Sequence, residues 1–575
     1  MPNHEQVSAG LNVSNQGSAI ALRLPEKIMT LEHMGAMFPH RLSFVRLLLR
    51  RLKRENWQFS RPVWRMNAEG YGVAVYSLKG PERTYSLVAF SNELGPEHRT
   101  DRVIATAWDA SFTLHDGLPS EDDIARLAAN VPLQEAGRIS ESELSLSRAN
   151  KSLRLFDHVV DRLAAGLQPD YEIVSSVGYL FRTTAVYGSG KMGAADFEKT
   201  GTYPGLAGPF QAEMLVVYLI REFSLDLVEH VAAMRAPKKA VVLTDYTRRQ
   251  FGVGNSTGLG MAPFLVNHPA ILNQWMLVRE TALARVRDLP IAGQKDQLTA
   301  YASTFRQRVS QWQTDDVEQT HRNQLLCDDM DKLSAFLHTL EFANFTRWNE
   351  VYEWSERHLS TDGQEGLISL LIEMNGPTVD NLEALYDVNE LDSFVINGLW
   401  RIGDVVAALD SDYTWAFNFN FDDPDEMARF WYVSEEKLEP RLGERWHEEG
   451  SERELPLGIA RAICNLRDEL SHFDMDSKLA EFLLLHPEHR HICRRLQLHQ
   501  TRPYSEICDN ILSAKMRPID LLRFKLACFG ALRFDPRSDR WLRISLYQNA
   551  PFARELQESD DTWMFPTAAT VDSIR

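Results

Sequence analysis

Two glycine-rich segments carry the residues of this 575-residue chain that are best suited to binding an anion. The first runs from Gly188 to Gly193, and its three glycines have the spacing G-x-G-x-x-G. The second runs from Gly252 to Gly260, and its four glycines surround an Asn-Ser-Thr sequence. Glycine permits unusual backbone conformations, and successive backbone N–H groups in such turns form concave sites for anions. We therefore expect the two segments to hold a small anion together.

Side chains in and beside these segments supply charge and proton-transfer groups. Arg182 and Lys191 add positive charge, which favours carboxylates and phosphates. The candidate acid–base residues are Lys191, His268 and Tyr187, since each type can exchange a proton when its pKa is tuned. His268 precedes a predicted helix start, where negative charge is favoured. The candidate binding residues are Arg182, Ser189, Gly190, Gly254, Asn255, Ser256, Thr257 and Gly258.

The first segment lacks the context of a dinucleotide-binding unit. A helix should begin within the glycine motif, but residues 196–209 contain three glycines and two prolines. A ribose-binding acid about twenty residues further on would fall near Glu213, inside an apolar helix. The Walker A pattern fails too, because Met192 stands where serine or threonine is needed. We expect the helices 210–234 and 269–288 to pack and so bring the two segments together.

Other clusters of chemical side chains predict ordinary surface structure. The stretch from His486 to His491 offers one Glu-x-x-His pair without the second that a di-metal bundle needs. Glu350, Glu353 and Glu356 lie on a predicted surface or interface helix, and Glu222, Asp226 and Glu229 on a solvated helix face. We predict no metal site. The five cysteines contain no C-x-x-C pair, which indicates reduced thiols.

The surrounding elements predict an α+β fold that is predominantly α-helical, with small antiparallel meander and hairpin elements. Alternating apolar residues and turn residues predict a meander over 72–76, 85–90 and 103–114. The same signals predict a hairpin over 414–421 and 428–433, and a last strand over 540–546. Ser120 should cap a helix, and residues 41–54 should form a basic amphipathic helix docked on its own domain.

The expected regions are five: a flexible N-terminal arm (1–27), an α+β N-terminal domain with the meander (28–135), a helical central domain with the glycine-rich segments (136–359), a helical C-terminal domain with a β-hairpin near 413–433 (360–555), and a loose tail (556–575). The polar first 27 residues do not resemble a signal peptide. No apolar run approaches the roughly 18 residues of a transmembrane helix.

The formal net charge of −18 disfavours nucleic acid as a partner. The leading hypothesis is a cytoplasmic enzyme that acts on a small carboxylate- or phosphate-bearing metabolite. Cofactor-independent acid–base chemistry, as in a lyase, isomerase or hydrolase, is its simplest mechanism. One alternative is a helical scaffold without catalysis, which could be a homo-oligomer. The other is a nucleotide-dependent oxidoreductase that uses the G-x-G-x-x-G segment. The sequence does not decide whether a cofactor binds.

Overall fold

The chain folds into two compact units, each made of separate stretches of sequence. The computed structural model describes residues 20–36, 40–95, 107–131, 140–183, 200, 203–255, 269–312, 317–385, 395–418, 431–434, 440–442, 454–456, 459–507, 518–530, 533–538, 541–559, 561 and 563. Residues 1–37, 262–524 and 538–540 form the first unit. Residues 38–261, 525–537 and 541–575 form the second.

The second unit is built around one mixed β-sheet. Its helices are α4 (Phe44–Arg54), α5 (Glu121–Ala129), α6 (Phe156–Ala164), α7 (Tyr171–Val177), α9 (Gln211–Arg235), α10 (Asp245–Arg249) and η7 (Ala553–Glu555). Its strands are β1 (Gln58–Met66), β2 (Gly72–Lys79), β3 (Thr84–Ser91), β4 (Ala110–Asp116), β5 (Glu143–Lys151), β6 (Tyr179–Thr183), β7 (Gly252–Asn255), β11 (Arg533–Ser538) and β12 (Trp541–Leu546).

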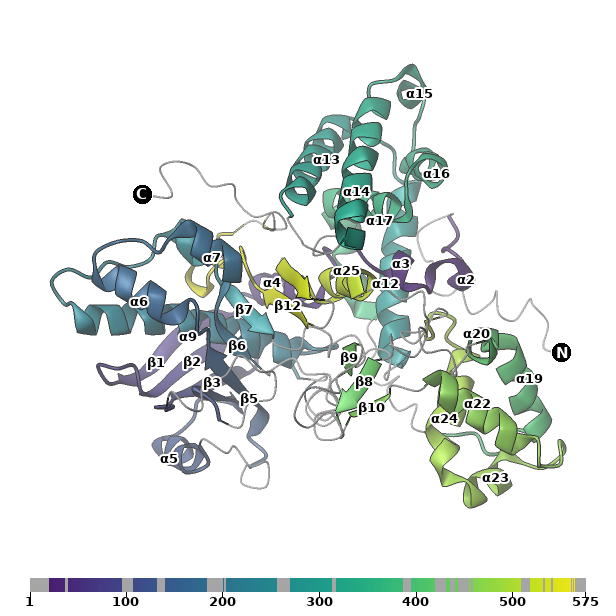
Figure 1. Cartoon of the computed structure of the whole chain (residues 1–575), viewed down its shortest axis with the longest axis horizontal. Coiled ribbons are helices and arrows are strands. Elements are labelled where there is room, and N and C mark those ends of the chain that lie inside the picture. The colour runs from purple at the N-terminus through teal and green to yellow at the C-terminus, as the bar shows by residue number, and fades with distance from the viewer. Residues whose placement is uncertain are drawn as a thin grey trace. The chain divides into compact units, whose positions relative to one another are not determined.

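The nine strands follow the order β1-β2-β3-β4-β5-β6-β7-β12-β11, and the sheet curls into a half-barrel. The strands from β1 to β6 pair antiparallel with their neighbours. The pairing of β6 with β7 is parallel, and β12 returns antiparallel beside β7. Figure 1 shows β1, β2, β3 and β5 as a twisted stack, with α9 and α6 beside it.

Both faces of this sheet are covered by helices. Neighbouring residues of a strand point to opposite faces, so Tyr76 and Val75 contact different helices. Tyr76 and Phe112 pack against Phe223 of α9, with ring centroids 6.4 Å and 5.6 Å apart. The other face packs on α5 through a buried apolar cluster of Val75, Val88, Phe90, Ile124 and Leu127.

The expectation of small antiparallel β elements is wrong for this unit. The predicted meander exists as β2, β3 and β4, but it is one part of a nine-stranded mixed sheet. The central domain 136–359, which the sequence predicts to be helical, adds β5, β6 and β7 to that sheet. β5 alternates, so its signal was present but overlooked, whereas β6 is a five-residue buried run and β7 is a four-residue run with two glycines, neither of which shows alternation. The mixed α+β character is correct.

The two predictions for single helices in this unit are confirmed. Ser120 caps α5, where its hydroxyl accepts from the N–H of Asp123 and the Asp123 carboxylate accepts from the N–H of Ser120. Helix α4 docks on its own unit, because Arg46 is fully buried and pairs with Asp561 at 3.0 Å. The basic side of α4 is therefore engaged within the unit.

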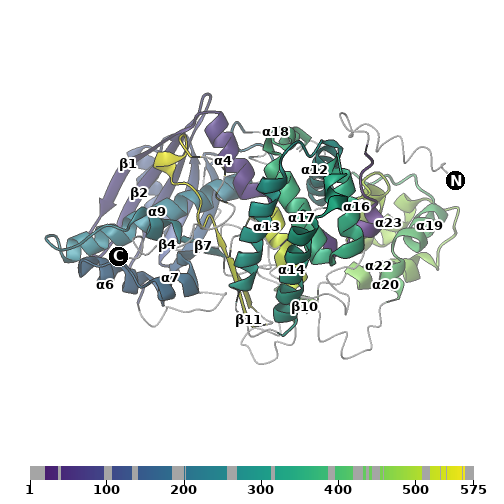
Figure 2. The same cartoon turned by 90° about the horizontal axis from the view of Figure 1, so that it is seen from above.

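The first unit is mainly helical. Its longer helices are α12 (Pro269–Asp288), α13 (Lys295–Ser310), α14 (Val317–Phe336), α16 (Trp348–His358), α17 (Thr361–Met374), α19 (Ile402–Asp412), α22 (Ile459–Leu470) and α24 (Arg490–His499). Its shorter ones are α2 (Pro25–Ile28), α3 (Leu31–Met34), α15 (Leu340–Ala343), α18 (Gly376–Val379), η3 (Leu382–Leu385), α20 (Thr414–Phe417), α23 (Leu479–Leu485) and η6 (Pro487–His489). Helix α25 (Pro518–Phe529) spans the boundary between the units. Figure 2 shows α12, α13, α14, α16 and α17 side by side.

The hairpin predicted near residues 413–433 is not formed as expected. Residues Thr414–Phe417 are helical, as α20, and pack against α22. The predicted return strand is present in part as β8 (Trp431–Ser434), which lies between β9 (Pro440–Leu442) and β10 (Glu454–Pro456). Alternating aromatic and polar residues therefore misled the prediction for 414–417, where packing against a helix decides the structure.

A buried ion network joins the start of the chain to α12 and α17. Arg23 donates to both carboxylate oxygens of Glu280 at 2.8 Å and to Glu365 at 2.8 Å. Arg279 also donates to Glu365, and the side chains of Arg279, Glu280 and Glu365 are fully buried. Burial alone would raise the pKa of Glu365, but Arg23 and Arg279 outweigh it and hold that pKa well below its usual range.

No helix in the described part of the chain is long and apolar enough to span a membrane.

Candidate functional site

The two glycine-rich segments continue from neighbouring strands of the sheet. β6 and β7 pair in parallel, with Arg182 opposite Gly254 and Thr183 opposite Asn255. Thr183 and Asn255 end their strands, and the carboxyl ends of parallel strands lie at one edge of a sheet. The last described residues before 184–199 and 256–268 are therefore side by side. The predicted packing of the helices 210–234 and 269–288 is not tested, because the two helices belong to different units.

Three of the predicted site residues lie within the described part of the chain: Arg182, Gly254 and Asn255. Arg182 lies in β6 and is 6% exposed, and Gly254 and Asn255 lie in β7. The structure brings these three together in two consecutive rows of the β6–β7 ladder. The other predicted site residues lie outside the described residues: Tyr187, Ser189, Gly190, Lys191, Ser256, Thr257, Gly258 and His268.

The first part of the second glycine-rich segment is strand β7, and its two glycines have a packing role. A Cβ atom on Gly252 would lie 2.4 Å from the carbonyl oxygen of Leu546 in β12. A Cβ atom on Gly254 would lie 2.8 Å from the ring of Tyr179 in β6. Both distances are far inside ordinary contact between carbon and its neighbours, about 3.5–4.0 Å. Close packing around β7 is therefore sufficient reason for glycine at these positions.

Helix α9 connects β6 to β7, so these elements form a βαβ unit. Two contacts fix its direction. Arg221 donates its Nε to the carbonyl of Phe251, directly before β7, at 2.8 Å. One turn earlier, Tyr218 packs against Tyr547, with centroids 5.1 Å apart. Tyr547 directly follows Leu546, the β12 residue that is paired with Val253. Because β12 and β7 are antiparallel, Tyr547 lies beside Gly252, one residue further along β7 than Phe251. Helix α9 therefore runs opposite to β7, and its first turn points toward the carboxyl end of that strand.

The first turn of α9 contains a buried carboxylic acid, Glu213. Glu213 precedes Arg221 by eight residues, about 12 Å along a helix, and β7 advances about 13 Å from Phe251 to Asn255. Glu213 is thus level with the carboxyl edge of β6 and β7. The residue is 4% exposed, and its Oε1 has no hydrogen-bond partner among the described residues.

Burial gives Glu213 an unusual protonation state. Loss of hydration disfavours the carboxylate and raises the pKa of Glu213 to about 8, although its own backbone N–H acts in the opposite sense. The acid is therefore mostly protonated at neutral pH. Strongly shifted pKa values are concentrated at functional sites, and a protonated glutamic acid can act as a general acid. The helix N-terminus beside it favours an anion.

The sequence alone singles out Glu213 only as an unsuitable ribose-binding acid for a dinucleotide site. Its signal in the sequence is a single acid in the first turn of an otherwise apolar stretch, Phe210–Ile220. Such a residue is seldom fully buried without a partner. The observation that distinguishes it, burial level with a strand edge, comes only from the fold.

Two further acids of α9 pair with arginines and a third is buried, which corrects the expected solvated face. Asp226 pairs with Arg61 at 2.7 Å, and Glu229 pairs with Arg248 at 2.8 Å. Glu222 is 9% exposed, and burial raises its pKa. Asp226 and Glu229 attach α9 to its surroundings at the end away from Glu213.

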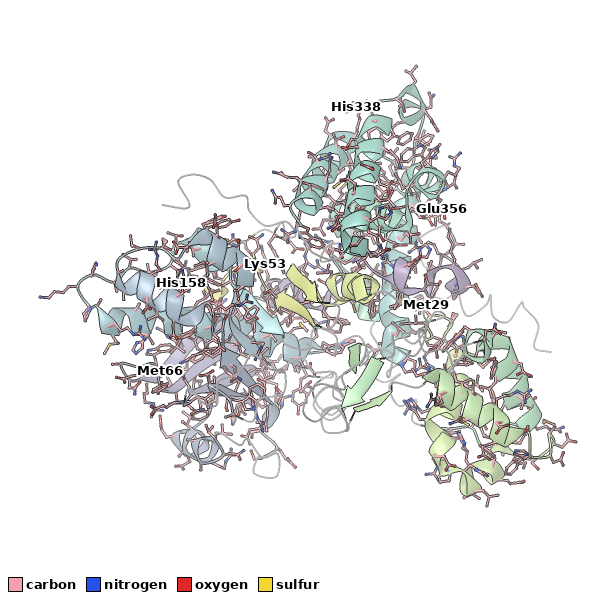
Figure 3. The ribbon with its side chains drawn as sticks, viewed as in Figure 1. Met29, Lys53, Met66, His158, His338 and Glu356 are labelled. Carbon is pink, nitrogen blue, oxygen red and sulfur yellow. The ribbon has the colours of Figure 1, made fainter. Side chains whose placement is uncertain are left out.

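The acids of α16 have structural partners. Glu350 caps the helix by accepting from the N–H of Arg347 at 2.9 Å. Glu356, labelled in Figure 3, pairs with Lys27 and accepts from Tyr352 at 2.9 Å. The described cysteines are free thiols, and burial raises the pKa of Cys327, Cys464, Cys493 and Cys528. Raised thiol pKa values indicate poor nucleophiles.

Comparisons of this chain with protein-family models, with curated proteins and with solved structures find no match. We therefore infer the function from the site itself.

Proposed function

We propose that the protein is an enzyme that binds a small carboxylate- or phosphate-bearing metabolite at the carboxyl edge of β6 and β7 and transfers a proton there. The observation that carries the proposal is the parallel register of Thr183 and Asn255, level with the buried acid Glu213. Ligands of α/β units bind outside the carboxyl ends of parallel strands, beside helix N-termini. A cytoplasmic location is part of this proposal.

Each group has a role in this proposal. Arg182 and Lys191 neutralise the anion, and the backbone of the segment 256–260 donates hydrogen bonds to it. Glu213, protonated at neutral pH, donates a proton without repelling the anion. Lys191 or Tyr187 accepts a proton from the substrate. One group donates a proton and another accepts one, so their pKa values must be shifted in opposite directions. Such an acid–base pair fits a lyase, an isomerase or a hydrolase.

The experiment is a thermal-shift screen of the full chain against carboxylates, phosphates and nucleotides. A ligand that binds only the native state raises the unfolding temperature by mass action. We expect one carboxylate or phosphate class to raise it, and we expect Lys191→Ala and Ser256→Ala to abolish the shift. Lys238→Ala changes an exposed lysine after α9 and serves as the matched control, which should keep the shift.

Two results would contradict the proposal. If no anion raises the unfolding temperature, the site does not bind the proposed ligand class, and the scaffold alternative is favoured. If nucleotides alone raise it, the nucleotide-dependent oxidoreductase is favoured. A shift that survives Lys191→Ala and Ser256→Ala equally would place the ligand elsewhere in the chain.

A further inference from the structure

Two histidines and a glutamate meet in the first unit, far along the chain from the glycine-rich segments. Glu469 lies near the end of α22, His486 directly follows α23, and His489 ends η6. One ligand atom from each of the three lies within 4.8 Å of the others. His486 Nδ1 is 3.8 Å from Glu469 Oε2 and 3.4 Å from Glu488 Oε1. The cluster therefore joins two imidazoles to a carboxylate, with a second carboxylate close by.

Aromatic packing holds both imidazoles in place. Phe482 stacks on His486, with centroids 4.9 Å apart and an interplanar angle of 14°. The same ring stacks on His489 at 5.7 Å and 25°. Phe473 meets the edge of His486 at 5.6 Å. Because rotation of either imidazole would break these contacts, the nitrogen atoms are preorganised, as ligand atoms of a metal site must be.

His489 contributes the second imidazole of the cluster. The residue is 8% exposed. One of its ring nitrogens is among the three ligand atoms of the cluster. The imidazole is therefore buried, fixed and directed toward Glu469 and His486.

The geometry points to a Zn²⁺ site formed by Glu469, His486 and His489. At metal–ligand distances of about 2.0–2.2 Å, two ligands of a tetrahedral Zn²⁺ lie about 3.3–3.6 Å apart. The 3.8 Å between His486 Nδ1 and Glu469 Oε2 is within a few tenths of that range. Two imidazoles and a carboxylate are a common donor set for Zn²⁺, with water as the fourth ligand. Glu488 adds negative charge that favours the cation.

A similar cluster in the second unit lacks this character. His115, Asp123 and Glu143 also bring ligand atoms within 4.8 Å of one another. Arg126 already donates to Asp123 at 3.0 Å and to Glu143 at 2.8 Å. A guanidinium therefore neutralises these two carboxylates, whereas among the described residues Glu469 and Glu488 form their ion pairs with His486. The site at His486 is thus the better cation site.

Bound Zn²⁺ would join the end of α22 to the α23–η6 connection. The cluster brings together residues 469 and 489, which are twenty positions apart in the chain. Binding energy for a metal that needs the folded arrangement becomes folding energy for that arrangement. We therefore expect Zn²⁺ to stabilise this part of the first unit.

Isothermal titration of Zn²⁺ into the full, untagged and chelator-treated chain tests the site. We expect one equivalent to bind, and His486→Ala and Glu469→Gln to weaken that binding at least tenfold. His472→Ala changes an exposed histidine on the α22–α23 connection and is the matched control, with unchanged binding expected. Glu469 is half-exposed, so Glu469→Gln tests the ligand without disturbing the core.

Cobalt(II) substitution identifies the donors. A tetrahedral site of nitrogen and oxygen ligands should give visible d–d bands without the thiolate charge-transfer bands that cysteine ligands produce. The bands should disappear in His486→Ala and remain in His472→Ala. The proposal is overturned if the chain binds no Zn²⁺, if His472→Ala weakens binding as much as His486→Ala does, or if thiolate bands appear.

Discussion

Replacing Glu213 with glutamine tests the most unusual group of the candidate site. Burial raises the pKa of Glu213 from 4.5 to about 8. Below about pH 4.5 the acid is protonated in both the folded and the unfolded chain, and its ionisation costs no stability. Between the two pKa values the unfolded chain loses the proton while the folded chain keeps it. The free energy of unfolding therefore falls as the pH rises, by about 1.4 kcal/mol per pH unit from this group.

Glutamine has nearly the same shape but does not titrate, so Glu213→Gln removes this component. Between about pH 5.5 and about pH 7.5, the stability of the variant relative to the wild type should increase by about 2–3 kcal/mol. Any constant cost of placing an amide in the pocket is the same at both values of pH and cancels in this difference. Guanidinium unfolding followed by tryptophan fluorescence measures the two free energies.

The control is Glu69→Gln, at an exposed glutamate in the turn before β2. It should follow the wild type at both values of pH. An equal offset between Glu213→Gln and wild type at the two values would refute the reasoning, because it would mean that Glu213 ionises in the folded protein much as it does in the unfolded chain.

Three further predictions concern stability and are measured by the same unfolding experiment. Glu365→Gln should destabilise the first unit by about 3–5 kcal/mol, because two arginines would keep buried charges without a carboxylate; a loss below 1 kcal/mol would contradict this. Gly254→Ala should cost about 1–3 kcal/mol through its contact with Tyr179, and an unchanged midpoint would show that the ring can move away. Ser120→Ala should cost about 1 kcal/mol from the cap of α5, whereas Ser120→Asp should cost much less.

The elements that follow a simple local pattern were predictable. Strands β2 and β3 are rich in β-branched and aromatic residues and are joined by a short turn. Helix α12 begins at Pro269, where a missing N–H has no consequence, as the sequence indicated. The expected last strand is β12. In these cases the local residues favour the same structure that the whole fold requires.

The strands that complete the sheet could not be predicted, for different reasons. β1 contains Pro62 and many exposed residues, because it is an edge strand with a register shift between Ser60 and Val63. β7 has the composition of a loop, and its two glycines are explained only by neighbours from β6 and β12. The pairing of β12 with β7 joins residues almost 300 positions apart, which no local pattern encodes.

The sequence directs attention to part of the candidate site but not to all of its groups. Glycine spacing points to the stretch after β6 and to β7, and the parallel pairing of these two strands is not visible in that spacing. Glu213 was missed because a lone acid in an apolar helix has the same sequence whether it is solvated or buried. His489 lies in a stretch that the sequence predicts to be ordinary surface structure, because its stacking on Phe482 depends on a turn that only the fold reveals.

The ion network of the first unit also sets an order of events during synthesis of the chain. Arg23 finds its partner Glu365 342 residues later. At translation rates of about 5–20 residues per second, the N-terminal segment waits about 17–70 s for that partner. During this time, three residues that are fully buried in the finished protein have no core to pack into: Ile28, Met29 and Met34. A nascent chain paused in this interval should present an apolar peptide to chaperones, although the finished protein hides it.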